Sequence, residues 1–450
     1  MDFEFSRVLT EENNVLIVGD GDLSFSVAFI TRYPDVNLTA TNLESDEIML
    51  SKYPNFVSNQ SYLRNQGASV STGVDATQLQ QYFQPQQFSH ILFNFPHVGG
   101  KSNIKKNRQL LDSFFRSAVD HIRENGKILV TLCKGQGGTE ADQPRREWCN
   151  SWQVTAKAAN AGLLLISVDK FLGNVMFEAY LSTGFRSQNK RFHTEGSMVH
   201  KFVKSPRLPQ ASSDLAPGMW MSEGSILQSL IDSISHSWNI VTEAAKTPHH
   251  VNHYLEYYCP QTVIFSGTNQ PHSPIHYVNK FHLTHDNDIV TLVTTGGEEV
   301  IVGRWTSDHL TMCMVDVLKR VYATEDLRYF SNGRLLACDF HTLATGEIEV
   351  DIETPISIYP PEYRFDISFW LPKTGYTMAD FLALVYRVSR HFVREVTLID
   401  TYTDIESART SHCYSIVYQS LDMPASYTDA YSYYQCLRES AADALCVTLR

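Results

Sequence analysis

The sequence lacks the patterns that define disulfide-rich, zinc-binding and membrane-spanning proteins. Its eight cysteines are scattered, without a Cys-x-x-Cys pair or a spacing from histidine that suits tetrahedral zinc. No stretch stays apolar over the roughly 20 residues of a membrane span, and the first residues lack the basic and apolar segments of a signal peptide. We therefore expect a reduced, intracellular protein with no metal and no membrane partner, in the cytoplasm or, alternatively, in the nucleolus.

The chain also lacks an overall excess of basic residues. Its formal net charge is −12, and the acidic excess falls after residue 205. Such a charge argues against general binding to nucleic acid, because phosphates repel an acidic surface. The first part of the chain is close to neutral, so local runs of lysine and arginine there can still contact phosphates.

The length and the hydrophobic pattern predict three domains. Residues 1–205 alternate short β-branched apolar runs with amphipathic stretches, which predicts an α/β Rossmann-like domain with a parallel sheet covered by helices. A linker rich in proline and serine then precedes an α+β middle domain of unknown role over residues 218–353. Residues 356–450 follow the order β-α-β-β-α-β, which predicts a ferredoxin-like α+β domain.

A glycine turn follows the first predicted strand. Gly19 and Gly21 stand between that strand and the first helix, where a ligand can approach the backbone near the positive end of the helix. The dinucleotide pattern G-x-G-x-x-G needs a third glycine where Ser24 stands. The turn alone is therefore weak evidence for a cofactor.

Polar residues at the ends of the next three strands strengthen the case. Glu44 follows the second strand, where a carboxylate can accept hydrogen bonds from ribose hydroxyls. Asp75 follows the third strand and can accept a bond from an adenine amine, and Asn94 ends the fourth. Capping of the helices that follow is the alternative explanation for Glu44 and Asp75. Because these groups would converge with the glycine turn on one edge of the sheet, we favour a cofactor site.

The fourth strand ends in the most informative motif of the chain. It runs into Asn94-Phe95-Pro96-His97, which places an amide, an aromatic ring and an imidazole at the carboxyl edge. The motif resembles the Asn/Asp-Pro-Pro-aromatic motif of enzymes that methylate planar nitrogens, where polar groups align the nitrogen and the aromatic stacks on the base. In this sequence the ring precedes the proline.

Four ordered motifs carry a more specific resemblance: VGDGDLSFS, GVDAT, FNFPHVGGKSNIKKNRQLLDSFF and KILVTL. Together they resemble the Rossmann-like family that methylates N3 of a uridine in large-subunit ribosomal RNA, over roughly residues 13–204. The resemblance implies S-adenosylmethionine as the cofactor, held at Gly19, Gly21 and Asp22.

Methylation of uridine N3 requires loss of the imide proton, so a base or a set of preorganised donors is needed. His97 is the first candidate for this role, and Asn94 is the candidate for positioning the base. Asp20 and Asp22 are acidic alternatives. A hydrogen bond that stabilises the turn is the alternative role for His97.

A cationic run follows the same strand and predicts contacts to RNA phosphates, with Arg191 in a second run. The residues of the first run are Lys101, Lys105, Lys106 and Arg108. The family usually carries a Tyr-Pro pair before its last basic segment, and this chain has no such pair there. The choice of substrate therefore stays open.

Residues 356–450 resemble the ferredoxin-fold anticodon-binding domain at the end of phenylalanyl-tRNA synthetases, through Tyr359-Pro360, Arg364 and the strand that holds Tyr402. Arginine and exposed aromatic side chains can hold single-stranded bases, so Arg364 is a candidate RNA contact. The combination resembles the ferredoxin-fold anticodon-binding domain-containing proteins. We expect a methyltransferase acting on rRNA or tRNA, or alternatively an inactive protein that binds RNA or organises a complex.

Overall fold

The structure is a computed structural model of the 450-residue chain. It describes residues 14–84, 87–99, 103–172, 180, 182–183, 193–208, 210–211, 226–246, 262–266, 275–277, 281–286, 288–294, 299–306, 309–314, 316–317, 355, 357–389 and 392–450. The chain forms two compact units. The first contains Met1–Leu208, Thr354–Pro361 and Leu421–Tyr427, and the second contains Pro209–Glu353, Glu362–Ser420 and Thr428–Arg450.

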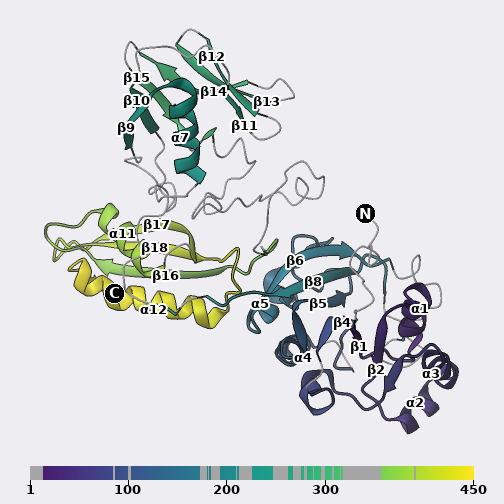
Figure 1. Ribbon diagram of the computed structural model, residues 1–450. Helices are drawn as coiled ribbons and strands as arrows, with labels where there is room; N and C mark the ends of the chain where they lie inside the picture. The colour runs from purple at the N-terminus through teal and green to yellow at the C-terminus, as the bar shows by residue number, and fades with distance from the viewer. Residues whose placement is uncertain are drawn as a thin grey trace. The chain divides into compact units, whose positions relative to one another are not determined.

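The first unit is built on a seven-stranded sheet of order β3-β2-β1-β4-β5-β8-β6 (Figure 1). Its strands are β1 (Asn14–Val18), β2 (Asn37–Thr41), β3 (Ser69–Ser71), β4 (Phe88–Asn94), β5 (Ile122–Leu132), β6 (Leu163–Lys170) and β8 (Met198–Lys204). The pairs among β1 to β5 are parallel, whereas β8 runs antiparallel to both of its neighbours. Dinucleotide-binding sheets have the order 3-2-1-4-5-6, so the inserted antiparallel strand sets this sheet apart from them.

Both faces of this sheet are buried under helices. Because side chains alternate along a strand, Leu16 and Val18 of β1 belong to one core and Val15 and Ile17 to the other. Helices α4 (Ile104–Val119) and α5 (Val154–Ala159) pack on the first core. Helices α1 (Ser24–Arg32), α2 (Asp46–Lys52) and α3 (Phe56–Asn65) pack on the second. The predicted α/β Rossmann-like fold is confirmed.

Two short segments from late in the chain complete the first unit. The Ile358 amide donates a hydrogen bond to the Leu165 carbonyl of β6 at 3.0 Å, and Ile358 and Tyr359 pack against the core under α4. The Ser205 hydroxyl donates to the Asp422 carbonyl at 2.9 Å. Residues that precede β16 (Tyr363–Trp370) and residues that follow β18 (Thr410–Tyr418) are therefore part of this unit.

The second unit contains two antiparallel sheets. One has helix α7 (Ile226–Trp238) and the order β11-β12-β13-β14-β15-β10-β9, which confirms the predicted α+β class. Its strands are β9 (Val241–Lys246), β10 (Thr262–Ser266), β11 (Ile275–Tyr277), β12 (Phe281–Asp286), β13 (Ile289–Thr294), β14 (Glu299–Trp305) and β15 (His309–Cys313).

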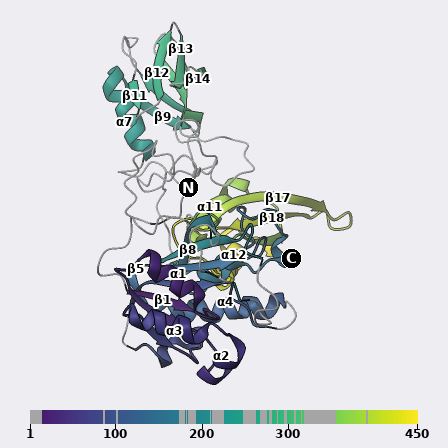
Figure 2. The same ribbon diagram turned by 90° about the vertical axis from the view of Figure 1, so that its right-hand side faces the viewer.

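The other sheet has the order β17-β18-β16-β19 and the predicted β-α-β-β-α-β connectivity, so the ferredoxin-like fold is also confirmed. Its elements are β16 (Tyr363–Trp370), α11 (Met378–Ser389), β17 (Val393–Thr403), β18 (Thr410–Tyr418), α12 (Tyr427–Ala444) and β19 (Thr448–Leu449). Figure 2 shows β17 and β18 as a long two-stranded ribbon. Phe365 and Phe369 pack against rings of α12 and α11, respectively, so the alternate positions of β16 form the opposite face.

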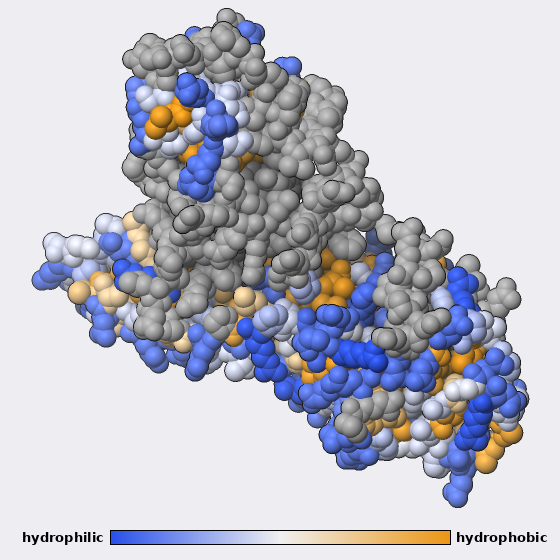
Figure 3. Space-filling model, viewed as in Figure 1, coloured by the Kyte–Doolittle hydropathy of each residue, from blue (hydrophilic) through white to orange (hydrophobic). Residues whose placement is uncertain are grey.

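The packing of α4 can be tested with a matched pair of leucines. Leu111 is fully buried in the core under α4, whereas Leu50 of α2 is 55% exposed. Figure 3 shows that apolar patches occur among the polar surface of the first unit. We expect Leu111→Ala to lower the free energy of unfolding by about 2–5 kcal/mol, because the substitution leaves a cavity. Leu50→Ala should change it by less than about 1 kcal/mol. Equal losses in urea unfolding would contradict this packing.

Candidate cofactor and RNA site

The loops that follow the parallel strands meet at the carboxyl edge of the sheet. The Asp20 amide donates to the Thr41 carbonyl, and the Val74 amide donates to the Asn42 carbonyl, both at 2.9 Å. The Phe95 amide donates to the Thr131 carbonyl, also at 2.9 Å. These bonds join neighbouring loops, so the predicted residues after β1, β2, β3 and β4 come together at one edge.

The two glycines of the first turn are required by the protein's own side chains. Gly19 has a φ of +67°, and a Cβ atom there would lie 2.7 Å from the Phe93 ring. A Cβ atom on Gly21 would collide with the Thr183 hydroxyl. The turn is therefore tightly packed, which is a second reason for glycine at both positions besides the predicted approach of a ligand.

Both carboxylates of the turn bind the beginning of α1. Asp20 Oδ2 accepts bonds from the Ser26 amide at 2.7 Å and from its hydroxyl at 2.6 Å, and Asp22 Oδ1 accepts one from the Ser24 amide at 3.0 Å. These bonds satisfy amides that have no partner within the helix. Burial raises the pKa of Asp20 to about 7 and also raises the pKa of Asp22.

Asn42 is a residue that the sequence reasoning missed. It directly follows β2 and is only 2% exposed, yet neither Oδ1 nor Nδ2 of its amide has a partner among the described residues. Buried amides are usually hydrogen-bonded, and this one offers a donor and an acceptor at the cofactor edge. Its signal in the sequence is its place at the strand end, two residues before Glu44.

Glu44 and Asp75 lie in adjoining loops, since the Gly73 amide donates to the Glu44 carbonyl at 2.9 Å. The Glu44 carboxylate is half-exposed and pairs with the Lys52 ammonium at 3.1 Å. Asp75 accepts bonds from the Thr77 amide and hydroxyl, both at 2.8 Å, at the start of the short helix η2 (Ala76–Gln81). Asp75 thus caps η2, and contacts of both residues with a cofactor stay a prediction.

The end of β4 is strained and partly buried. Phe95 has a φ of +52°, a conformation that costs a non-glycine residue about 1–3 kcal/mol, and its ring packs against Phe171. Asn94 Oδ1 accepts a 2.5 Å bond from the Thr131 hydroxyl, while its buried Nδ2 has no partner among the described residues. Its contact with a cofactor or substrate stays a prediction.

His97 uses one ring nitrogen to hold the turn. Its Nδ1 accepts a 2.8 Å bond from the Gly99 amide, so the proton of the neutral ring is on Nε2. Partial burial lowers the pKa of His97 and thereby favours the neutral ring. The alternative role that we considered for His97, stabilising the turn, is therefore present in the structure.

The predicted cations differ in their surroundings. Lys105 and Lys106 are exposed in the first turn of α4, which Asn103 caps through its side chain. Arg108 donates to the carbonyls of Cys149 and Ser151 at 2.8 Å and 2.6 Å, so it holds a turn of the protein itself. Lys101 and Arg191 lie outside the described residues. Binding of RNA by all five of these side chains stays a prediction.

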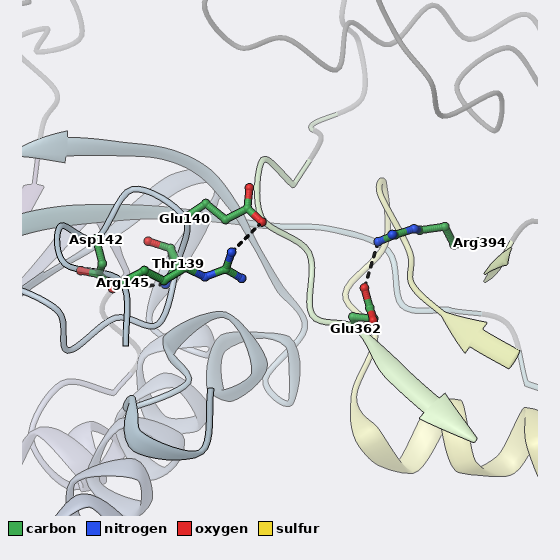
Figure 4. Close-up of polar contacts among 6 residues, drawn as sticks. All are labelled: Thr139, Glu140, Asp142, Arg145, Glu362 and Arg394. Atoms are coloured by element: carbon green, nitrogen blue, oxygen red, sulfur yellow. Dashed lines mark hydrogen bonds and ion pairs between the residues drawn. The ribbon is translucent and has the colours of Figure 1, made fainter. Parts of the chain in front are cut away.

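The ferredoxin-like sheet carries an aromatic and cationic cluster at the end of β16, which we call the Trp370 cluster. The guanidinium groups of Arg409 and Arg450 lie 5.0 Å and 5.2 Å from the centre of the Trp370 ring, and that of Arg450 lies 5.1 Å from the Tyr402 ring. Arg364, the contact that we predicted, lies on the same strand and pairs with Glu362 at 3.6 Å. Glu362 also pairs with Arg394 at 2.9 Å (Figure 4).

The described part of the chain contains no group of three or more His, Cys, Asp or Glu side chains placed to hold a metal ion. Within the same residues, no helix is both long and apolar enough to cross a membrane.

Comparison with protein families finds a match within the first unit. Residues 16–184 match the family described as BMT5-like, rRNA (uridine-N3-)-methyltransferase BTM5-like. The resemblance of this part of the chain to that family, which the sequence analysis predicted, is confirmed.

Among curated proteins, the chain is similar to the human ferredoxin-fold anticodon-binding domain-containing protein 1, with 45% identity over 194 residues. The match covers 42% of this chain and 31% of the human protein, so the chain spans about a third of that relative. The chain is also 31% identical over 159 residues to mouse mitochondrial phenylalanine–tRNA ligase, covering 34% of this chain and 33% of the ligase. Both resemblances agree with the families predicted from the sequence.

Among solved structures, the chain is similar to the glycopeptide N-methyltransferase MtfA complexed with S-adenosylmethionine, at 12% identity and a TM-score of 0.29. The match covers 44% of this chain and 84% of MtfA. TrmN from Thermus thermophilus matches at 16% identity and a TM-score of 0.26, over 43% of this chain and 44% of TrmN.

The raised pKa of Asp20 makes stability depend on pH. The native state holds this proton more tightly than the unfolded state, so the contribution of Asp20 is fully present below about pH 4 and is lost as the pH rises through about 7. An asparagine at this position cannot ionise. We therefore expect the free energy of unfolding of Asp20→Asn, relative to that of the wild type, to rise by about 2–3 kcal/mol between pH 5 and pH 8.

Urea unfolding at several pH values measures this difference, with the exposed Asp35→Asn as the control. Parallel pH profiles for Asp20→Asn and the wild type would contradict the burial of an ionisable Asp20.

Proposed function

We propose that the first unit is an S-adenosylmethionine-dependent methyltransferase that acts on N3 of a uridine in RNA. The observation that carries the proposal is the convergence of the buried Asn42 amide and the buried Asn94 Nδ2, which have no partner among the described residues, at the carboxyl edge of a sheet that matches the BMT5-like family. Ligands of open α/β sheets bind outside this edge. Buried donors and acceptors without partners among the described residues are the groups that a polar ligand would complete.

The residues present fit the cofactor. The Asn42 amide can donate and accept at once, which matches the hydroxyls of a ribose, each of which also does both. Glu44 stands in the same loop and Asp75 in the adjoining one, and both offer carboxylate oxygens. The turn from Gly19 to Asp22 precedes the amino end of α1. S-adenosylmethionine supplies an electrophilic methyl group on a sulfonium.

The tautomer of His97 revises the role that we propose for it. A ring whose Nδ1 accepts from Gly99 has no second lone pair to take a proton, but its Nε2–H can donate. As uridine N3 loses its proton, negative charge develops on the neighbouring carbonyl oxygens. We therefore assign His97 as a donor that stabilises this charge, and the proton passes to water.

Asn94 would orient the same base. Its Oδ1 is fixed by Thr131, which leaves the Nδ2 group as a donor with a defined direction. A donor to one uracil carbonyl, together with His97 at the other, would set the angle at which N3 meets the methyl group. We assign Asp20 and Asp22 no part in the transfer, since one oxygen of each carboxylate already binds the beginning of α1.

RNA would be held by charge near the edge and by stacking on the second unit. Lys105 and Lys106 offer phosphate contacts close to the end of β4. The Trp370 cluster combines aromatic faces with guanidinium groups, the combination that holds unpaired bases. Ribosomal RNA is suggested by the family of the first unit and transfer RNA by the second, and the substrate would set a nucleolar or a cytoplasmic location.

The second candidate is an inactive protein that binds RNA or organises a complex. Its support is that Asp20, Asp22 and His97 Nδ1 all bind groups of the protein itself. Total RNA incubated with the intact protein and methyl-labelled S-adenosylmethionine, followed by mass spectrometry of nucleosides, separates the two. Labelled N3-methyluridine is the expected product. Cofactor binding without any transfer to RNA would favour the inactive protein.

Asn42→Leu tests the position of the cofactor. We expect S-adenosylmethionine to bind about 5- to 13-fold more weakly in calorimetry, because one good hydrogen bond is worth roughly 1–1.5 kcal/mol. The cofactor-free variant should be more stable by roughly 1–3 kcal/mol, since two unpaired buried atoms are removed. Asn65→Leu, at an exposed position of α3, is the control. Unchanged affinity would exclude Asn42 from the site.

Alanine substitutions at two exposed tyrosines test whether the Trp370 cluster binds RNA. Tyr402 contacts Trp370 and is 43% exposed, whereas Tyr427 at the start of α12 is 58% exposed. We expect Tyr402→Ala to weaken binding of a single-stranded RNA roughly tenfold, as loss of one stacked base does. Tyr427→Ala should leave the affinity unchanged in fluorescence anisotropy. Equal effects would place the RNA elsewhere.

A further inference from the structure

Three deeply buried polar side chains meet at the turn that follows β5, and the proposed methyl transfer uses none of them. Thr139, Asp142 and His200 are each at most 2% exposed. Thr139 Oγ1, Asp142 Oδ1 and His200 Nε2 have no hydrogen-bond partner among the described residues. Native proteins rarely leave such atoms unpaired, so three together indicate a ligand.

The backbone of this turn holds Thr139 and Asp142 close together. Asp142 Oδ2 accepts bonds from the Gly138 amide at 2.6 Å and from the Thr139 amide at 3.2 Å. The Asp142 amide donates in return to the Thr139 carbonyl at 3.2 Å. Figure 4 shows Thr139 and Asp142 on this turn, together with the ion pair between Glu140 and Arg145.

His200 reaches the same turn from β8. A Cβ atom on Gly137 would lie 2.5 Å from His200 Nε2 and 3.2 Å from Asp142 Oδ2, so the imidazole and the carboxylate face the same point of the backbone. Glycine at position 137 is what allows the ring to come so close. His200 Nε2 and the Asp142 carboxylate thus lie at the same point of the turn, and Thr139 is held beside Asp142 by the backbone bonds.

The polarity of the cluster defines what it would bind. His200 Nδ1 lies 3.3 Å from the Val130 carbonyl, so Nδ1 carries the proton and Nε2 is an acceptor. Burial lowers the pKa of His200 although Asp142 opposes the shift, which agrees with a neutral ring. Asp142 Oδ1 is a second acceptor, and the Thr139 hydroxyl is a donor. The cluster therefore needs a partner with two donors and one acceptor.

We propose that a single internal water molecule occupies this cluster. It donates to Asp142 Oδ1 and His200 Nε2 and accepts from the Thr139 hydroxyl, which satisfies all three atoms at once. The water joins the turn after β5 to β8, the antiparallel strand inserted next to it. A metal ion fits less well, because the cluster offers only one carboxylate and one imidazole, and the described residues contain no group of three or more His, Cys, Asp or Glu side chains placed to hold a metal.

The proposal is tested by whether one substitution speeds or slows amide hydrogen exchange in this turn. Thr139→Val keeps the shape and removes the hydroxyl, whereas Thr139→Ser keeps the hydroxyl. With a bridging water, amide hydrogens of residues 133–142 should exchange roughly 5- to 10-fold faster in Thr139→Val, the factor that corresponds to one lost hydrogen bond. Thr139→Ser should exchange nearly as the wild type does. Circular dichroism confirms that both variants fold.

Slower or unchanged exchange in Thr139→Val would overturn the proposal, because removing a truly unpaired hydroxyl stabilises a buried turn. A high-resolution crystal structure of the full chain gives the direct readout. Water density within hydrogen-bond distance of all three atoms is the expected result. Empty space, or a metal ion with an anomalous signal, would overturn it.

Discussion

The parallel pairing of β1 with β2 on one side and β4 on the other is the constraint on which the candidate site depends. It sets Val15 opposite Leu38 and His90, so the three strands end at the same edge. Both faces of the sheet are packed under helices, so the polar residues that follow the strands gather at this edge. A shift of one residue in either pairing would move a core side chain to the wrong face and dismantle both the core and the site.

The same edge carries several unfavourable features of the first unit. Leu23 and Phe95 have φ values of +66° and +52°, and Asp20 is buried with a pKa of about 7. Asn42 and Asn94 leave buried amide groups without partners among the described residues. Strain and unpaired groups persist where the surrounding structure holds them in place, and they concentrate where a protein binds something. The proposed cofactor would supply partners for these groups, so that part of their unfavourable free energy would be recovered when it binds.

The sequence was sufficient to predict the helices and strands whose hydrophobic pattern is local. The parallel strands were predictable because their buried apolar runs are continuous, and α4 because its buried residues repeat with a helical period. Strand β8 was not predicted, because its pairing partners β5 and β6 lie far from it in sequence and its residues are of mixed polarity. The two late segments that complete the first unit could not be predicted for the same reason.

At the site, the positions were predictable but the roles were not. Asp75 and Asp20 stand at strand ends, where capping and ligand binding favour the same residue types, and only the hydrogen bonds to Thr77 and Ser26 reveal the caps. Arg108 contacts carbonyls about forty residues away in the chain, which no spacing rule reveals. Asn42 was overlooked because the carboxylate of Glu44 is the usual partner of a ribose. Its importance depends on burial, which only the folded chain shows.

A crystal structure of the protein with S-adenosylhomocysteine tests the central claim most directly. The account predicts that the cofactor product lies along the carboxyl edge of the first sheet, with the Asn42 amide hydrogen-bonded to it and the β4 end at its sulfur. A product bound elsewhere, or an Asn42 amide that stays without a partner in the complex, would contradict it.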